Sequence, residues 1–257
     1  MIRILLAAIC LTSFATTLPA APPEVRVLTY NIHHGEGTDG KLDLERIAKV
    51  ITAARPDIVA LQEVDAKTHR TGNVDQAAEL AKLTKMQVAF GAAMKFDGGE
   101  YGNAILSRWP LGDVQVHKLP RDSAESPEPR VVVESVVTPP LEGVPPFAFA
   151  STHLCHLSAA TRAAQTAALD ELFQQRKLPL LLAGDFNARS EQPPMQVLLA
   201  KDGSWIDLTA KISVIDYVLT RRGDGWRVRS AEALDEPVAS DHLPVLAVLE
   251  WVDSDKP

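Results

Sequence analysis

Carboxylates, carboxamides and imidazoles recur in this 257-residue chain at the points where apolar, strand-like segments end. The clearest case is PLLLAGDFNARS, in which an apolar run from Pro179 finishes in Asp185 and Asn187. Successive side chains of a strand point to opposite faces, so Asp185 and Asn187 share one face. Taken alone, this pair is as typical of a turn as of an active site, because Asp and Asn favour turns.

Other segments place similar side chains in the same way. Asn31 and His33 close VRVLTYNI, two positions apart and therefore on one face. The further residues of this kind are Glu63, His153, Asp216, Asp241 and His242. If these strand ends converge, four carboxylates would repel one another unless a cation compensates their charge. Oxygen ligands without cysteine indicate a hard divalent ion such as Mg²⁺ or Mn²⁺.

The elements that must position these residues are mostly strands. The patterns predict strands over 25–32, 58–64, 102–107, 130–137, 147–154, 179–187, 215–221, 226–230 and 243–251. They predict helices between Asp43 and Pro56, over 76–83 after an Asp75 cap, and over 158–177. Without a repeat or a linker along the chain, we expect a single α/β domain built on packed sheets over residues 22–257.

The first 21 residues have the pattern of a secretory signal peptide. Arg3 precedes a short apolar run that ends near Phe14, and small residues follow. The run is too short for a membrane-spanning helix, which makes a short anchor the weaker alternative. We therefore expect a secreted or periplasmic mature chain without stable membrane insertion. Cys10 would leave with the leader, so Cys155 could form no internal disulfide and is expected to be a packed thiol.

The formal net charge is −7, and no basic stretch of the kind that holds nucleic acid is visible. This composition disfavours a long polynucleotide as the partner but does not exclude one. We expect a monomer acting on a phosphoester substrate.

Seven segments in order resemble the endonuclease/exonuclease/phosphatase superfamily, which includes DNase I-like nucleases, sphingomyelinases and inositol-phosphate phosphatases. They are TYNIHHGEG, LQEVD, YGNAILSR, STHL, GDFNA, IDYVL and SDHLPV, and the resemblance runs from about Val25 to Trp251. It implies a four-layer α/β sandwich, in which two packed, mostly antiparallel sheets are flanked by helices and the site lies at one edge.

The resemblance also implies roles for individual residues. Glu63 matches the principal metal ligand of the family, and Asn31 and Asp241 match residues at or beside that metal. Asp185 and Asn187 match the pair that orients or deprotonates the attacking water and holds the phosphate. The matches to the remaining catalytic positions are His242 beside the scissile phosphate, Asp216 as the carboxylate that fixes its tautomer, and His153 as a second phosphate-binding histidine.

Three further residues are candidates for substrate binding, each with an ordinary alternative. His33 could contact phosphate or pack in its loop, Arg130 could face the phosphate or the solvent, and Asn103 could line the cleft or bond a neighbouring loop. Arg70 and Asp75 are expected to organise a loop and its helix cap. His34 and His156 are interpreted as structural.

The leading hypothesis is an exported, metal-dependent phosphoesterase that hydrolyses phosphodiesters, with phosphomonoesters as a second option, by metal-assisted attack of water. The acidic charge favours a small or lipid-derived substrate. We take Asp185 as the general base and keep the reverse assignment, with His242, open. A secreted nuclease is the alternative, and a non-catalytic binding module with the same fold is the weakest reading. The chain departs from the family between Asn187 and Asp216, where the segment is contracted and lacks a threonine-proline element.

Overall fold

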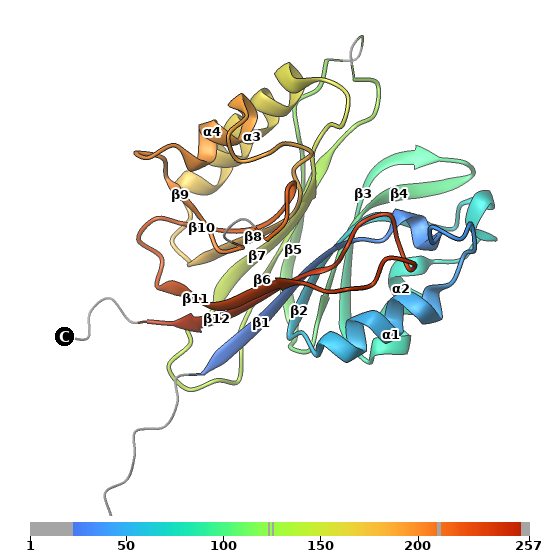
Figure 1. The fold of residues 1–257 in the computed structure, drawn as a ribbon, viewed down its shortest axis with the longest axis horizontal. Helices are drawn as coiled ribbons and strands as arrows, with labels where there is room; N and C mark the ends of the chain where they lie inside the picture. The colour runs from blue at the N-terminus through green and yellow to red at the C-terminus, as the bar shows by residue number, and fades with distance from the viewer. Residues whose placement is uncertain (1–22, 123, 125, 210–211, 253–257) are drawn as a thin grey trace, which may run out of the picture.

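Two six-stranded sheets pack face to face, and helices cover their outer faces (Figure 1). The computed structural model describes residues 23–122, 124, 126–209 and 212–252, so the predicted leader, with Cys10, lies outside the described residues. Eight of the ten strand pairings are antiparallel. The predicted four-layer α/β sandwich is therefore confirmed.

The first sheet carries the N-terminal and C-terminal strands in its centre. Its order is β11 (Trp226–Ala233), β12 (Val245–Trp251), β1 (Glu24–Asn31), β2 (Ile58–Ala66), β4 (Gly99–Ser107) and β3 (Gln87–Phe96). Helices α1 (Leu44–Ala54) and α2 (Gln76–Thr84) cover its outer face (Figure 1). Asp43 and Asp75 cap these helices by accepting from Arg46 N and Ala78 N, as predicted.

The second sheet has the order β5 (Leu111–Lys118), β6 (Val131–Val137), β7 (Phe147–His153), β8 (Leu180–Asp185), β10 (Asp216–Arg221) and β9 (Trp205–Asp207). Helices α3 (Ala159–Gln174) and α4 (Pro193–Leu199) cover it. Ser158 caps α3, and Leu169 and Phe173 form the apolar part of its buried face. Cys155 is buried, with its Sγ 2.9 Å from Ser126 Oγ, so the thiol is packed as expected.

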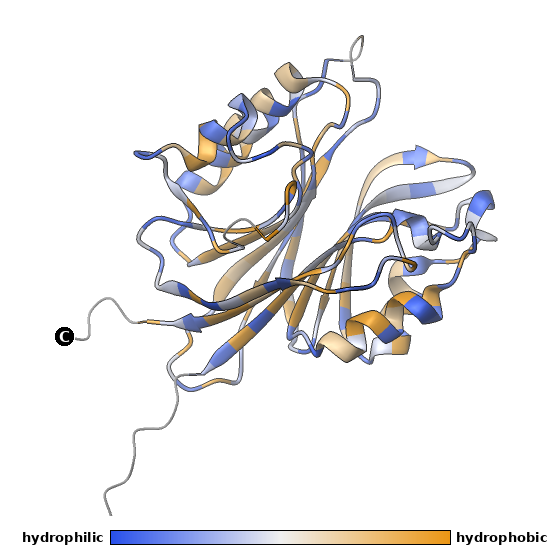
Figure 2. Cartoon of the chain, viewed as in Figure 1, coloured by the Kyte–Doolittle hydropathy of each residue, from blue (hydrophilic) through white to orange (hydrophobic). Residues whose placement is uncertain are grey.

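Three apolar layers hold the sandwich together. One lies between the sheets and includes Ile58, Val133, Phe149 and Leu181, and the other two lie under the helices. In Figure 2 apolar residues recur along the strands of both sheets, mixed with hydrophilic ones. Burying alternate side chains on both faces explains why the central strands read as nearly continuous apolar runs. Among the described residues, no helix is both long and apolar enough to cross a membrane.

The register brings the polar strand ends to one edge of the sandwich. β7 and β8 are parallel with His153 opposite Asp185, and β10 runs antiparallel to β8 with Asp216 opposite the same residue. Parallel pairing also aligns the ends of β1 and β2 in the first sheet, where Asn31 lies opposite Gln62. The fold thus places candidate residues from both sheets around one opening.

Candidate active site

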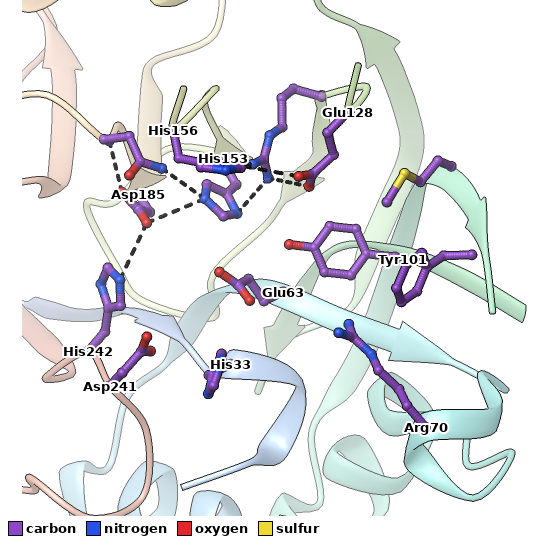
Figure 3. Close-up of a pocket in the computed structure, with 14 residues that line it drawn as sticks. His33, Glu63, Arg70, Tyr101, Glu128, His153, His156, Asp185, Asp241 and His242 are labelled. Carbon is purple, nitrogen blue, oxygen red and sulfur yellow. Dashed lines mark hydrogen bonds and ion pairs between the residues drawn. The ribbon is translucent and has the colours of Figure 1, made fainter. Parts of the chain in front are cut away.

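A cleft of about 350 Å³ opens at this edge, between the ends of the two sheets (Figure 3). The sequence-predicted residues that line it are His33, Glu63, Arg130, His153, Asp185, Asn187, Asp241 and His242. Two more, Asn31 and Asp216, contact these residues from behind. Residues far apart in the sequence are therefore brought together as the resemblance implied.

Asp185 lies at the centre of the cleft and is almost fully buried. Its Oδ2 accepts from Asn31 Nδ2 at 3.2 Å and lies 3.4 Å from His153 Nε2 and 3.7 Å from His242 Nε2. Its Oδ1 accepts from the backbone N of Asn187 at 2.8 Å, which fixes the carboxylate plane. Burial, followed by the nearby charge of Asp216, raises the pKa of Asp185 to about 7.

His242 lies between two carboxylates. Its Nδ1 is 3.2 Å from Asp216 Oδ2, and its Nε2 faces Asp185. Burial opposes the charged form, but the hydrogen bond and charge of Asp216 outweigh it and raise the pKa of His242 to about 9. At neutral pH this imidazole is therefore charged and presents a proton to the cleft.

His153 has the opposite character. Burial and the adjacent Arg130 guanidinium hold the pKa of His153 well below its usual range, so the imidazole is neutral. Arg130 can only donate, so its Nη1, 2.9 Å away, makes His153 Nδ1 an acceptor and leaves the ring proton on Nε2. Nε2 faces the acceptor Asp185 Oδ2 at 3.4 Å and lies 2.9 Å from Asn187 Nδ2, which donates to Leu154 O at 3.1 Å. The two histidines next to Asp185 therefore differ in charge, with His242 charged and His153 neutral.

A β-bulge directs Glu63 into the cleft. The register of β2 against β4 shifts between Leu61 and Val64, and Glu63 has a φ of +58°, a left-handed conformation that is uncommon outside glycine. In a regular strand Glu63 would share the outer, helix-covered face with Leu61. The bulge instead turns it toward Asn31, whose Nδ2 donates to Glu63 Oε1 at 3.0 Å. A left-handed backbone at a non-glycine residue costs folding free energy and is found mainly at functional sites, which agrees with a functional role for Glu63.

The donor set fits a divalent cation. Glu63 and Asp241 line the cleft without forming an ion pair to any cationic side chain of the described residues, whereas Arg130 is paired with Glu128 at 3.1 Å. Carboxylates gathered in this way favour a hard cation. Asn31 turns its amide nitrogen toward Glu63 and Asp185, and its Oδ1 accepts from His33 N at 3.1 Å. Asn31 therefore orients the two carboxylates, and its role as a direct ligand stays a prediction.

Asn103 does not reach the cleft. It is buried, and its Nδ2 donates to Val131 O at 3.0 Å, which links β4 of the first sheet to β6 of the second. The prediction that Asn103 binds substrate is therefore not met, because the opposite sheet covers this part of the inner face. Tyr101 shares that face by period 2 and lies nearer the strand start, where the cleft opens.

Sequence reasoning missed the side chains on one side of the cleft. Met94, Phe96 and Tyr101 come from the β3–β4 hairpin, and the Arg70 guanidinium lies 4.6 Å from the Phe96 ring centroid. Figure 3 shows Tyr101 and Arg70 on this side of the cleft. Arg70 also pairs bidentately with the buried Asp65, as expected of a residue that organises its loop. Strand β3 was itself not predicted. Only the segment EYGNA, in which Tyr101 lies two residues before Asn103, could have indicated that Tyr101 lies at the cleft.

Two further polar neighbours of Arg130 were not predicted to lie at the cleft. Glu128 accepts from Arg130, and His156 Nδ1 lies 3.1 Å from Arg130 Nη2. His156 therefore lines the cleft, although it was interpreted as structural. In the sequence, only the short spacing of Glu128 and Arg130 in PEPR could have indicated their ion pair.

The contracted segment after Asn187 still positions Asp216. Ser213 Oγ donates to Asp216 Oδ2 at 3.2 Å and accepts from Asp216 N at 3.0 Å. Helix α4 and strand β9, neither of which was predicted, occupy the preceding residues. A local serine thus holds the carboxylate where relatives were expected to use a threonine-proline element.

Comparisons with known proteins agree with this geometry. Residues 28–242 match the family model described as "Endonuclease/Exonuclease/phosphatase family". A curated Escherichia coli K12 protein, the uncharacterized YbhP, is 30% identical over 172 residues, which span 63% of this chain and 66% of YbhP.

Two solved structures illustrate the similarity in fold. An endonuclease/exonuclease/phosphatase from Beutenbergia cavernae superposes with a TM-score of 0.70 at 26% identity, over 89% of this chain and 72% of that chain. The human Nocturnin catalytic domain with bound sulfate superposes with a TM-score of 0.71 at 22% identity, over 90% and 96% of the two chains.

Proposed function

Because the chain belongs to the endonuclease/exonuclease/phosphatase family, we propose that it is an exported phosphoesterase that uses Mg²⁺ or Mn²⁺ to hydrolyse phosphodiester bonds with water. The observation that carries this proposal is the buried Asp185 carboxylate between a charged His242 and a neutral His153. Export is inferred from the leader-like pattern of residues 1–21.

The residues of the chain divide the work of hydrolysis among them. Glu63 and Asp241 would hold the divalent cation, which would supply neutralisation of charge on the phosphate oxygens. Asp185, with a pKa of about 7, is suited to accept a proton from the attacking water at neutral pH. Asn187, held beside Asp185 by its backbone N–H, orients that water and the phosphate.

The two histidines and Arg130 stabilise negative charge in different ways. His242 is charged and donates from Nε2 toward the phosphate, and Asp216 holds its Nδ1. His153 is neutral and donates from Nε2, because Arg130 occupies its Nδ1. Fixed donors aimed at developing charge are the main way that such sites lower a barrier.

Apolar side chains on both sides of the cleft support a small or lipid-derived substrate. Met94 and Phe96 border it on the hairpin side. Beyond His242, a second hollow of about 290 Å³ is lined by Ile212, Val214 and Leu243, which are 44%, 53% and 42% exposed. Apolar groups left exposed beside a phosphate site favour a substrate with an apolar portion.

The test is hydrolysis of bis-p-nitrophenyl phosphate and p-nitrophenyl phosphate by the purified mature chain. We expect turnover with Mg²⁺ or Mn²⁺ and none with EDTA. Glu63→Ala should lower the rate by at least ~10²-fold, since it removes the carboxylate that the cation needs. Glu100→Ala is the matched control, because Glu100 pairs with the exposed Lys95 and neither residue lines the cleft.

Two outcomes would change the proposal. If the wild type turns over neither ester with any divalent ion across a broad panel, the chain is not a phosphoesterase. If it cleaves DNA or RNA but not phospholipid or nucleotide diesters, the nuclease alternative replaces the proposed substrate class.

A further inference from the structure

We propose that His33, His34 and Glu63 form a nitrogen-containing cation site that binds Zn²⁺ in preference to Mg²⁺. Each residue offers one ligand atom, and the three atoms lie within 4.8 Å of one another. Figure 3 shows His33 next to Glu63, on the side away from Asp185. The inference rests on the proposed function, because Glu63 is also one of the carboxylates, with Asp241, that would hold the cation for hydrolysis.

Contacts with Glu36, a hydrogen bond for His33 and a longer approach for His34, leave one nitrogen of each imidazole for a metal. His33 Nδ1 lies 3.1 Å from Glu36 O, and His34 Nε2 lies 3.5 Å from Glu36 Oε2. The nitrogens that remain are His33 Nε2 and His34 Nδ1. Metal-binding histidines usually donate their other ring N–H to a carbonyl or a carboxylate, and Glu36 supplies one of each.

The second nitrogen is an orphan in the structure. His34 Nδ1 is buried and has no hydrogen-bond partner among the described residues. With the ring proton on Nε2, which lies 3.5 Å from Glu36 Oε2, His34 Nδ1 carries an unpaired lone pair. Buried polar atoms are normally paired, so an unpaired nitrogen grouped with the cleft-lining His33 and Glu63 needs an explanation, and a metal ion provides it.

All three residues of this group have a left-handed backbone conformation. His33, His34 and Glu63 have φ values of +46°, +44° and +58°, and they are three of the ten non-glycine described residues with positive φ. Left-handed backbone at non-glycine residues persists only where the surroundings enforce it, and it gathers at functional sites. Here Gln76 Nε2 donates to His34 O at 2.6 Å and holds the turn. A histidine that only packed its loop would not require this conformation.

The ligand types select the metal. Two imidazoles and one carboxylate suit Zn²⁺, whereas Mg²⁺ takes oxygen ligands almost exclusively. The oxygen ligands Asp241 and Asp185 remain on the other side of Glu63 for a hard cation. His34 therefore changes from a structural residue, as the sequence indicated, to a metal ligand.

The experiment measures Zn²⁺ binding by the metal-free mature chain in excess Mg²⁺, with a chromophoric chelator as competitor. We expect one Zn²⁺ per chain in the wild type, and an affinity at least ~10-fold weaker in His34→Gln. X-ray absorption at the zinc edge should show two imidazole ligands in the wild type and one in the variant. His69→Gln is the matched control, because its side chain is 69% exposed and pairs with Asp97 outside the cleft.

The outcomes separate this inference from the proposed function. Zinc with only oxygen ligands, or equal Zn²⁺ affinity of wild type and His34→Gln, overturns the zinc site. This holds whether or not Mg²⁺-dependent hydrolysis is observed. Circular dichroism of His34→Gln shows whether its fold is kept, and if it is not, the wild-type absorption spectrum alone decides the ligands. Absence of ester hydrolysis with two imidazoles on zinc would contradict the proposed activity and leave the metal site standing.

Discussion

Two histidines of one cleft acquire opposite charge states from their surroundings. Asp216 on Nδ1 keeps His242 protonated, while burial, together with Arg130 on Nδ1, keeps His153 neutral. Both rings then direct an Nε2 proton toward Asp185. When neighbours push the pKa values of two groups apart, the groups can take different acid–base roles. The neighbours, more than the histidines themselves, determine the chemistry of the site.

Replacing Asp216 by Asn should move the pH dependence of the reaction. In the wild type, the rate should fall as pH rises through about 9, where His242 loses its proton. Asp216→Asn removes the charge that outweighs burial, so the alkaline limb should shift toward the ordinary histidine pKa of 6.5 or below. We also expect the maximal rate to drop by about 10²-fold, since the ring loses its orientation. Rate profiles from pH 5 to 10 check this.

The control for this variant is Asp207→Asn, which changes a carboxylate bonded to Thr209 and not to a cleft histidine. Its profile should match the wild type. An alkaline limb that stays near pH 9 in Asp216→Asn would show that Asp216 does not set the protonation of His242.

At the scale of elements, the glycine of the GDFN segment is required by the close approach of two strands. A Cβ on Gly184 would lie 2.0 Å from Thr152 O of the neighbouring strand β7. Gly184 and Thr152 directly precede the paired residues Asp185 and His153. The absence of a side chain therefore allows the close approach of the two strands that carry these candidate catalytic groups.

Gly184→Ala should consequently weaken both the fold and the site. The clash is with backbone, so β7 and β8 must move apart, at a cost of about 1–3 kcal/mol. This corresponds to a fall in Tm of roughly 2–10 °C for a chain of this size. Ester hydrolysis should fall further than stability alone explains, because Asp185 and His153 lose their register. Thermal unfolding and rate measurements on the same samples test the prediction.

Gly112→Ala is the matched control for this substitution. Gly112 lies on the edge strand β5, where an added Cβ would come no closer than 3.7 Å to Val136 O. A Gly184→Ala protein with unchanged Tm would mean that the strands have more room than their separation indicates.

The elements differ in how well their sequences predicted them. β8 was predicted because LLLAGD is a continuous apolar run, and α1 because Asp43 caps an apolar periodicity. β5 was missed because LGDVQVHK is an exposed edge strand with Gly and Asp at its start. The bulge at Glu63 has no local signal, since IVALQEV is equally typical of a regular strand. Its direction depends on pairing with β4, which is a tertiary contact.

Local sequence likewise predicts some candidate site residues and not others. Asp185 and Asn187 could be placed on one face from period 2 alone. Asn103 could not be excluded, because its exclusion depends on Val131 in the opposite sheet. His34 showed nothing beyond its residue type, because its unpaired nitrogen is visible only with Glu36 and Glu63 in place.

At the scale of the whole molecule, the site exists only when the two sheets are packed. The first sheet and its connecting loops contribute Glu63 and Asp241, and the second contributes His153 and Asp185. Asn31 connects the halves directly, by donating to Glu63 and Asp185. Packing the sheets thus brings like charges together and stores repulsion in the metal-free fold.

This repulsion should make stabilisation by a divalent cation depend on pH. The pKa of Asp185 rises from 3.8 to about 7 on folding, so its protonation favours the metal-free fold at low pH. That contribution is complete below about pH 4 and is lost as pH rises through 7. A bound cation prefers the ionised carboxylate, so it should offset the loss at high pH and compete with protons at low pH.

We therefore expect Mg²⁺ or Mn²⁺ to raise Tm little at pH 5 and clearly at pH 8. At a cation concentration near 100 times Kd, the free energy of unfolding rises by about 2.7 kcal/mol, which corresponds to a Tm increase of roughly 5–10 °C for this chain. Scanning fluorimetry with EDTA or the cation at each pH measures it. Glu63→Gln should lose most of the gain at pH 8, and Glu100→Gln should keep it, since Glu100 pairs with Lys95 outside the cleft. An equal gain in Tm at both pH values would mean that the cation does not bind beside Asp185. Cation binding depends on the protonation of Asp185 only if the cation lies close to this carboxylate.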